Sequence, residues 1–220
     1  DPTHLEERRR FFTIWLARVL GLDTSDELAH YLFRAGQYHA GHGPRRIHVP
    51  PAYITTSVGM MGAAFAGCMN DARLPGDVVA PAMAGWNKYL SVQLHLMNLG
   101  YQTAIEFSQG QFPITLAFYG RLRKAVGMQT LAACIGEGET LEALLRRFFN
   151  YMPRLRADCL RPVWHSHEKD DSSWVEVYQS YIPAPGGWRI LLNGRDVAHA
   201  EGFGSRVRPD DVVSIFPPGR

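Results

Sequence analysis

The chain has 220 residues, of which 46% are hydrophobic and 20% are charged, and its formal net charge is +2. Residues 1–110 hold nine basic and nine acidic side chains, and residues 111–220 hold fourteen and twelve. Neither half has the basic excess that is typical of a nucleic-acid binder, so we expect no DNA or RNA partner. The length allows one or two domains, each with its own core.

Three cysteines, Cys68, Cys134 and Cys159, are spread far apart. An odd and sparse set suits a reducing compartment better than a disulfide framework. No uninterrupted apolar run reaches the ~18 residues of a membrane span, and no cleavage pattern follows Arg8-Arg9-Arg10. We therefore expect a cytoplasmic protein with no membrane segment. No nucleophile–base pair or phosphate-binding loop is recognisable, so hydrolytic or phosphoryl-transfer activity is not expected.

The first half reads as four helices, over residues 5–22, 26–40, 52–69 and 77–107. Pro50-Pro51 is well placed to open the third, because proline is tolerated in a first helical turn. The third helix carries small residues that permit close helix packing: Gly59, Gly62, Ala63, Ala66 and Gly67.

The second half has a different pattern of apolar and polar residues. Strands are predicted over residues 114–119, 128–135, 188–192 and 212–216, with an amphipathic helix over 141–151. Residues 163–187 read as polar and irregular, with a possible strand over 174–181, and Asn193-Gly194 is a turn signal. This order suits a small mixed sheet covered by one helix, which is an α+β fold.

A motif in the first half joins Gly36-Gln37-Tyr38-His39, a Gly/Pro loop and Val49-Pro50-Pro51-Ala52-Tyr53-Ile54. Over about residues 5–108 the chain resembles sensor globins and protoglobins. The resemblance implies a globin-like helical domain over residues 1–110. The loop after His39 is a few residues longer than in most sensor globins. Three leading helices of that superfamily have no counterpart: either they have been removed, or a partner completes the pocket.

The resemblance further implies a haem cofactor with His39 as the metal ligand. A neutral imidazole is a good axial ligand when apolar walls hold the macrocycle. His48 is the second candidate ligand and His42 the third. The candidate walls are Phe11, Phe12, Trp15, Leu16, Tyr53 and Met60, and the candidates for the propionates are Arg34, Arg45 and Arg46. Most of these candidate wall residues are expected to lie in an ordinary helix–helix core. Some globin-fold sensors bind no haem.

Three motifs of the second half are Phe118-Tyr119-Gly120-Arg121-Leu122-Arg123, Leu191-Leu192-Asn193-Gly194-Arg195-Asp196-Val197, and residues 210–218 from Asp210 to Pro218. Over about residues 113–219 they resemble the small, sulfur-carrying subunit of molybdopterin synthase. The resemblance implies a ubiquitin-like β-grasp domain over residues 113–220. Asp210 replaces the glycine usual before the last strand, and aspartate tolerates left-handed geometry.

Sulfur-carrier chemistry in that family needs a bare Gly-Gly terminus, whereas this sequence ends Pro217-Pro218-Gly219-Arg220. As written, this tail is not expected to carry sulfur, and the domain is expected to act as a binding module. A trimmed terminus leaves the question open.

A homodimer is expected through residues 52–69 and 77–107, because sensor globins pair through their last two helices and the missing leading helices leave apolar surface uncovered. The alternative is that Trp86, Leu90, Leu94 and Met97 pack inside one protomer or against the β-grasp half.

Three functions stay open. The first is a haem-binding sensor of a diatomic gas or of redox state, with the β-grasp domain as a protein-interaction output. The second is a sulfur-carrier-type protein of cofactor biosynthesis with a helical docking domain. The third is a haem-free dimeric scaffold.

Overall fold

The computed structural model describes residues 2–156, 160–168, 175–183 and 188–217. The chain divides into two compact units, Asp1–Ala104 and Ile105–Arg220. The division falls inside a helix, a few residues before the boundary expected near residue 110. Each unit is described by itself.

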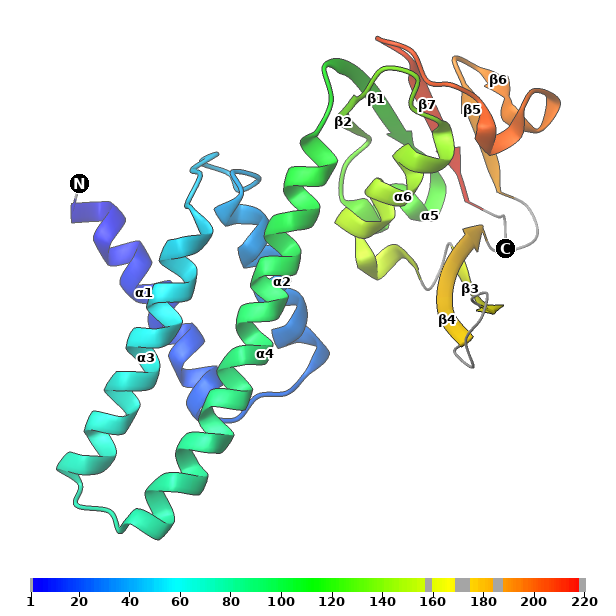
Figure 1. The fold of residues 1–220 in the computed structure, drawn as a ribbon. Coiled ribbons are helices and arrows are strands. Elements are labelled where there is room, and N and C mark those ends of the chain that lie inside the picture. The colour runs from blue at the N-terminus through cyan, green and yellow to red at the C-terminus, as the bar shows by residue number, and fades with distance from the viewer. Residues whose placement is uncertain (1, 157–159, 169–174, 184–187, 218–220) are drawn as a thin grey trace. The chain divides into compact units, whose positions relative to one another are not determined.

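The first unit is built from helices: α1 (Pro2–Leu20), α2 (Asp26–His39), α3 (Pro51–Asp71) and α4 (Gly76–Ser108) (Figure 1). All four expected helices are present, with ends that differ by a few residues. The Ser25 hydroxyl caps α2 by accepting a hydrogen bond from the Leu28 amide at 3.2 Å. Pro51 occupies the first turn of α3, where its missing N–H costs no helical hydrogen bond.

A small apolar cluster joins α1 to α3 and α4. Val19, Trp86 and Leu90 are buried at its centre, and Phe65 stacks on Trp86 with ring centroids 4.2 Å apart. Partly buried neighbours complete it: Trp15, Val58, Met61, Phe65 and Tyr89. Trp86 and Leu90 are therefore buried within one chain.

Helix α3 is apolar and largely uncovered. Among the described residues it is the one helix long and apolar enough to cross a membrane, with a mean hydropathy of 1.2 over an 18-residue window of which 11% is buried. The expectation of no membrane segment rested on uninterrupted apolar runs, and threonine, serine and glycine do interrupt the apolar residues of this helix. One such helix is weak evidence for a membrane span.

The second unit is a β-grasp fold. Its main sheet contains β1 (Phe112–Phe118), β2 (Thr130–Ile135), β5 (Arg189–Leu192), β6 (Arg195–Asp196) and β7 (Val212–Phe216), in the order β2-β1-β7-β5-β6. The central strands β1 and β7 are parallel, and the other pairs are antiparallel. Helix α6 (Leu141–Tyr151) covers one face of this sheet (Figure 1).

The core of the second unit lies between this sheet and α6. Alternate residues of β1 point into it, including Leu116 and Phe118, and Phe118 stacks on Phe148 with centroids 5.2 Å apart. The predicted inward face of α6 is confirmed, because Leu141, Leu144, Leu145, Phe148 and Phe149 are all buried.

Two turns follow the sequence-based expectations. Asn193 and Gly194 have φ of 51° and 83°, as the turn between β5 and β6 requires. Asp210 adopts φ of 64°, so aspartate does hold the left-handed position before β7.

The short helix α5 (Gly120–Val126) and the first strand of a separate hairpin were not expected, and the second strand of that hairpin was expected only as a possible strand. Strands β3 (Leu160–Glu168) and β4 (Val175–Pro183) pair antiparallel over nine residues, where mostly irregular chain was predicted; the possible strand over 174–181 coincides with β4. The polar sequence of β3 lacks the apolar alternation that marks a half-buried strand, so it was missed. Short 3-10 turns lie at Pro153–Leu155, Val197–His199 and Gly202–Gly204.

Candidate functional site

His39 is the last residue of α2, and the backbone around it is fixed by a specific helix ending. The Gly41 amide donates to the Tyr38 carbonyl at 3.0 Å, and the His42 amide donates to the Gln37 carbonyl at 3.1 Å. Gly41 has φ of 92°, the left-handed conformation that such endings place just after a helix. The chain therefore turns sharply after His39.

One turn before His39, α2 and α4 touch through their backbones. A Cβ on Gly36 would overlap the Met97 carbonyl, and a Cβ on Gly100 would overlap the Phe33 carbonyl. Two reciprocal glycines allow this approach, because any side chain would push the helices apart. The crossing holds the C-terminal end of α2 against the middle of α4.

The segment leading into α3 returns to His39. The Val49 amide donates to the His39 carbonyl at 2.7 Å, and an antiparallel bridge pairs Ala40 with His48. His48 Nε2 lies 2.6 Å from the Tyr101 hydroxyl on α4, with the two rings edge to face. The structure thus brings His39 and His48, two candidate ligands, to the same point of the unit.

The His39 imidazole is partly buried, and one of its ring nitrogens is unpaired among the described residues. Its Nδ1 atom is buried and has no hydrogen-bond partner among the described residues. Burial lowers the pKa of His39 below its usual value of 6.5, which favours the neutral ring near pH 7. Neutral imidazole is the form that binds haem iron, so this residue fits the implied ligand role.

The other predicted haem-site residues have varied surroundings. Phe11 on α1 is 61% exposed and Tyr53 on α3 is 65% exposed, and neither makes a hydrogen bond or ring contact with His39 in the described part of the chain. Trp15 belongs to the α1–α3–α4 cluster, where its indole N–H donates to Gln93 Oε1 at 2.8 Å.

The arginines predicted to meet the propionates lie on and after α2. The Arg34 guanidinium lies over the Tyr38 ring, 5.6 Å from its centroid. Arg45 is exposed and lies in the loop between His39 and His48. Burial also lowers the pKa of His42, the third candidate ligand.

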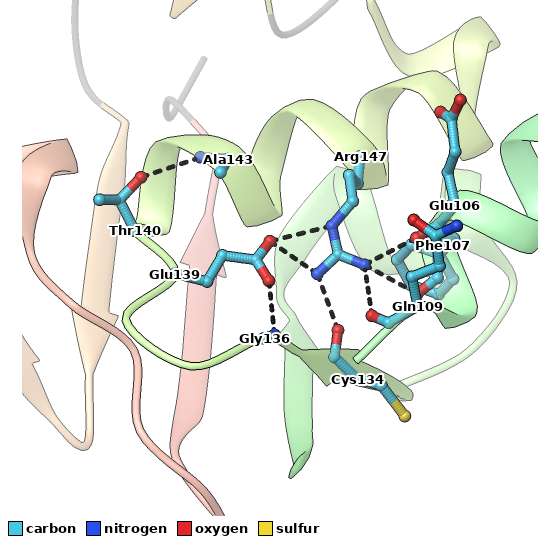
Figure 2. Close-up of polar contacts among 9 residues, drawn as sticks. All are labelled: Glu106, Phe107, Gln109, Cys134, Gly136, Glu139, Thr140, Ala143 and Arg147. Carbon is cyan, nitrogen blue, oxygen red and sulfur yellow. Dashed lines mark hydrogen bonds and ion pairs between the residues drawn. The ribbon is translucent and has the colours of Figure 1, made fainter. Parts of the chain in front are cut away.

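In the second unit, Arg147 of α6 gathers an unusual number of acceptors (Figure 2). Its guanidinium is bidentate to Glu139 Oε1 at 2.9 and 2.7 Å, and Glu139 Oε2 accepts from the Gly136 amide at 2.9 Å. It also donates to four backbone carbonyls, at 2.7–3.3 Å: Glu106, Phe107, Gln109 and Cys134.

These contacts make the end of α4 part of the second unit. Carbonyls in the last turn of a helix lack intrahelical donors, and Arg147 supplies them for α4. Phe107 of the same turn is buried in the core and stacks on Tyr151, with centroids 4.5 Å apart. The continuous helix α4 therefore begins in one unit and ends as an integral part of the other.

Sequence reasoning did not identify Arg147 or the pairing of Tyr101 with His48. Arg147 is one of two adjacent arginines on α6, and nothing in their spacing shows which of them turns inward. Tyr101 lies within the predicted helix over residues 77–107, and no pattern in the sequence pairs it with His48. The expectation about sulfur-carrier chemistry rests on Gly219 and Arg220, which lie outside the described residues.

Comparison with known proteins gives one family match. The Protoglobin family model matches residues 1–106. No curated protein matches the chain.

Several solved structures are similar to about half of the chain. Small archaeal modifier protein 1 from Methanosarcina acetivorans is 22% identical, with a TM-score of 0.35, covering 50% of this chain and 96% of its own. A putative molybdopterin converting factor, subunit 1, from Pyrococcus furiosus is 16% identical, with a TM-score of 0.34, covering 50% of this chain and 100% of its own. Modifier protein 1 of Haloferax volcanii is 18% identical, with a TM-score of 0.35 and the same two coverages.

At these identities and TM-scores the solved structures carry no argument about function. The β-grasp assignment rests on the strand order, on the parallel central pair and on the helix across the sheet. The family match and the helical fold agree for the first unit. Residues 1–106, just under half of the chain, thus match the Protoglobin family model, and the second unit has a β-grasp fold.

Proposed function

We propose that the helical domain binds haem through His39 and that the chain is a globin-type sensor of a diatomic gas or of redox state. The observation that carries the proposal is the His39 imidazole, which is favoured in its neutral form and leaves a buried nitrogen without a partner. A buried polar atom without a partner is costly, and metal binding is one way to relieve that cost. When bound, the iron would supply reversible binding of a diatomic ligand or a change of redox state.

The residues of this chain would hold and shield the group. His39 would supply the ligand nitrogen from a backbone that is fixed on both sides. The apolar side chains that α1 presents to solvent, Phe11, Phe12 and Ile14, are 61%, 48% and 45% exposed. Three neighbouring exposed apolar side chains are unusual on a finished helix surface and suit the wall of a macrocycle site. Arg34 and Arg45 remain candidates for the propionates.

The β-grasp domain is proposed as the output that contacts a partner protein. Support comes from Arg147, which fixes the last turn of α4 in the second domain. In a sensor of this kind a change in the helical domain would have to reach the β-grasp domain along the chain, and α4 is the helix that contributes residues to both units. A homodimer through residues 52–69 and 77–107 is part of the proposal, supported by the uncharged and largely exposed surface of α3.

Haem reconstitution tests the ligand assignment. His39→Ala is expected to abolish the Soret absorbance of the haem-loaded protein while far-UV helicity stays. His95→Ala is the matched control, because His95 is an exposed histidine on α4, and it should keep the full Soret band. If His39→Ala retains haem as the wild type does, or if the wild type binds none, the proposed function is wrong.

A further inference from the structure

Two histidines meet at the end of α2, and their surroundings differ. His39 has a buried nitrogen without a partner, whereas His48 is exposed and already bonded to Tyr101. A histidine whose Nε2 is held by a phenol at 2.6 Å must break that bond before it can bind metal through that atom. The two residues are therefore suited to different tasks.

We propose that His48 and Tyr101 form a latch that positions His39, and that His48 is not itself an iron ligand. The latch deepens the proposed function and rests on it for its haem-dependent readouts. Tyr101 and His48 are positioning residues in this proposal, because they act on His39 through the backbone.

The chain of contacts is short. The Tyr101 hydroxyl holds the His48 ring, and His48 pairs with Ala40 in a β-bridge. The next amide, Val49, donates to the His39 carbonyl at 2.7 Å. Because His48 and Val49 are consecutive residues, as are His39 and Ala40, a change at Tyr101 reaches the His39 peptide through His48 and its neighbour Val49.

The same turn of α4 holds His39 from its other side. A Cβ on Gly36, three residues before His39, would come within 2.9 Å of the Tyr101 amide nitrogen as well as overlapping Met97. The stretch of α4 from Met97 to Tyr101 thus meets α2 before His39 through its backbone, and the loop after His39 through the Tyr101 side chain. Between these contacts the His39 backbone has little freedom, which is what a preorganised metal ligand requires.

The experiment compares Tyr101→Phe with Tyr89→Phe in the full chain. Tyr89 is the matched control: it lies on the same helix, and its hydroxyl donates at 2.6 Å to a backbone carbonyl, that of Asp23, away from His39. In the haem-loaded protein, Tyr101→Phe should raise the haem dissociation rate by about three- to tenfold, the factor that corresponds to the loss of one ordinary hydrogen bond. It should also shift the iron–histidine stretching band in the resonance Raman spectrum, while Tyr89→Phe leaves both unchanged.

A conservative variant separates positioning from bulk stability. His48→Ala should match Tyr101→Phe, and the double variant should add little to either, because both remove the same bond. His48→Gln should restore the wild-type rate and band, since an amide can still bond the phenol. If Tyr101→Phe behaves like Tyr89→Phe, or if His48→Gln is as damaging as His48→Ala, the latch is wrong. Loss of all haem in His48→Ala together with retention in His39→Ala would make His48 the ligand and overturn the latch as well.

The latch has a readout that needs no haem. In haem-free protein, hydrogen–deuterium exchange of residues 40–49 should be faster in Tyr101→Phe than in Tyr89→Phe, with the Val49 amide as the main reporter. If the wild type binds no haem, the proposed function fails while this measurement still decides on the latch. Equal exchange in the two variants would overturn it.

Discussion

The two domains differ in how completely they bury their apolar side chains. The β-grasp core joins eighteen buried residues in one cluster, whereas the cluster that joins α1 to α3 and α4 has three buried members. The helical domain instead exposes apolar side chains, among them Phe11, Tyr53 and Met60, each more than 60% exposed. Among the described residues of this domain, four buried polar side-chain atoms have no hydrogen-bond partner, on His39, Trp86, Gln93 and Asn98.

The second domain covers its apolar side chains within its own core, whereas the first domain leaves several large apolar side chains exposed. Apolar patches on a folded surface usually mark an interface or a ligand site. In the β-grasp domain the same residue types are inside, where packing against the sheet stabilises the fold. The comparison predicts that substitutions in the β-grasp core change stability most, and that substitutions on the exposed apolar surface of the helical domain change the proposed haem binding or dimer formation.

The largest expected effect on stability comes from replacing a phenylalanine with alanine, compared between the two domains. Phe118→Ala removes a fully buried ring that stacks on Phe148. It should lower the unfolding free energy of the β-grasp domain by about 3–5 kcal/mol, the range for a large aromatic lost from a core. Phe11→Ala removes an exposed ring and should change stability by less than about 0.5 kcal/mol. Urea unfolding followed by far-UV circular dichroism measures both.

Measuring haem affinity of the Phe11→Ala and Phe118→Ala proteins separates the two domains further. Phe11→Ala should weaken haem binding, and Phe118→Ala should leave it unchanged. A Phe11→Ala protein that is strongly destabilised without haem would mean that Phe11 is an ordinary core residue, and the contrast between the two domains would fail for α1.

Arg147 is expected to give the next largest effect. Its side chain and that of Glu139 are 14% and 15% exposed, so Arg147→Ala leaves a nearly buried carboxylate and several carbonyls without a donor. The second domain should lose about 3 kcal/mol, as when one partner of a buried ion pair is removed. Arg147→Lys should recover only part of this, because an ammonium cannot reach all the acceptors of the planar guanidinium. Thermal unfolding checks both values.

Arg146→Ala is the control for that measurement. Arg146 is adjacent on α6 and exposed, so its loss should cost less than about 0.5 kcal/mol. Hydrogen exchange adds a local test, because Arg147→Ala should speed exchange in the last turn of α4 as well as in residues 130–139. Unchanged exchange in the α4 turn would show that Arg147 does not hold it.

Much of this fold follows from sequence periodicity. Helix α6 was predicted with its bounds and its inward face, because Leu141, Leu144 and Leu145 repeat at helical spacing. Strand β7 was also predicted with its bounds. The hairpin of β3 and β4 could not be predicted in the same way, because two strands outside the main sheet need no apolar alternation.

The candidate site was harder to predict than the fold. The motif around His39 predicted the ligand position, and in the structure the Nδ1 atom of this histidine is buried without a hydrogen-bond partner among the described residues. The contacts that fix it, from Tyr101 and from Gly100, come from about sixty residues further along the chain, and no local pattern reports such a pairing. Helical spacing also could not show that Leu90 is buried within one chain, because it does not tell an internal face from an external one.

The last prediction has the smallest effect on stability and tests the exposed surface of α3. Met60 is 68% exposed and lies on the uncharged face of this helix, so Met60→Glu should change the unfolding free energy by less than about 0.5 kcal/mol. In the proposed homodimer the new glutamate would bury a charge against an apolar surface, and this would disfavour dimer formation. Light scattering should then show a mass near 24.7 kDa for Met60→Glu and twice that for the wild type. Leu20→Glu, on an exposed apolar position of α1, is the control and should remain a dimer. A wild-type mass near 24.7 kDa would reject the dimer, and a dimeric Met60→Glu would place the interface away from α3.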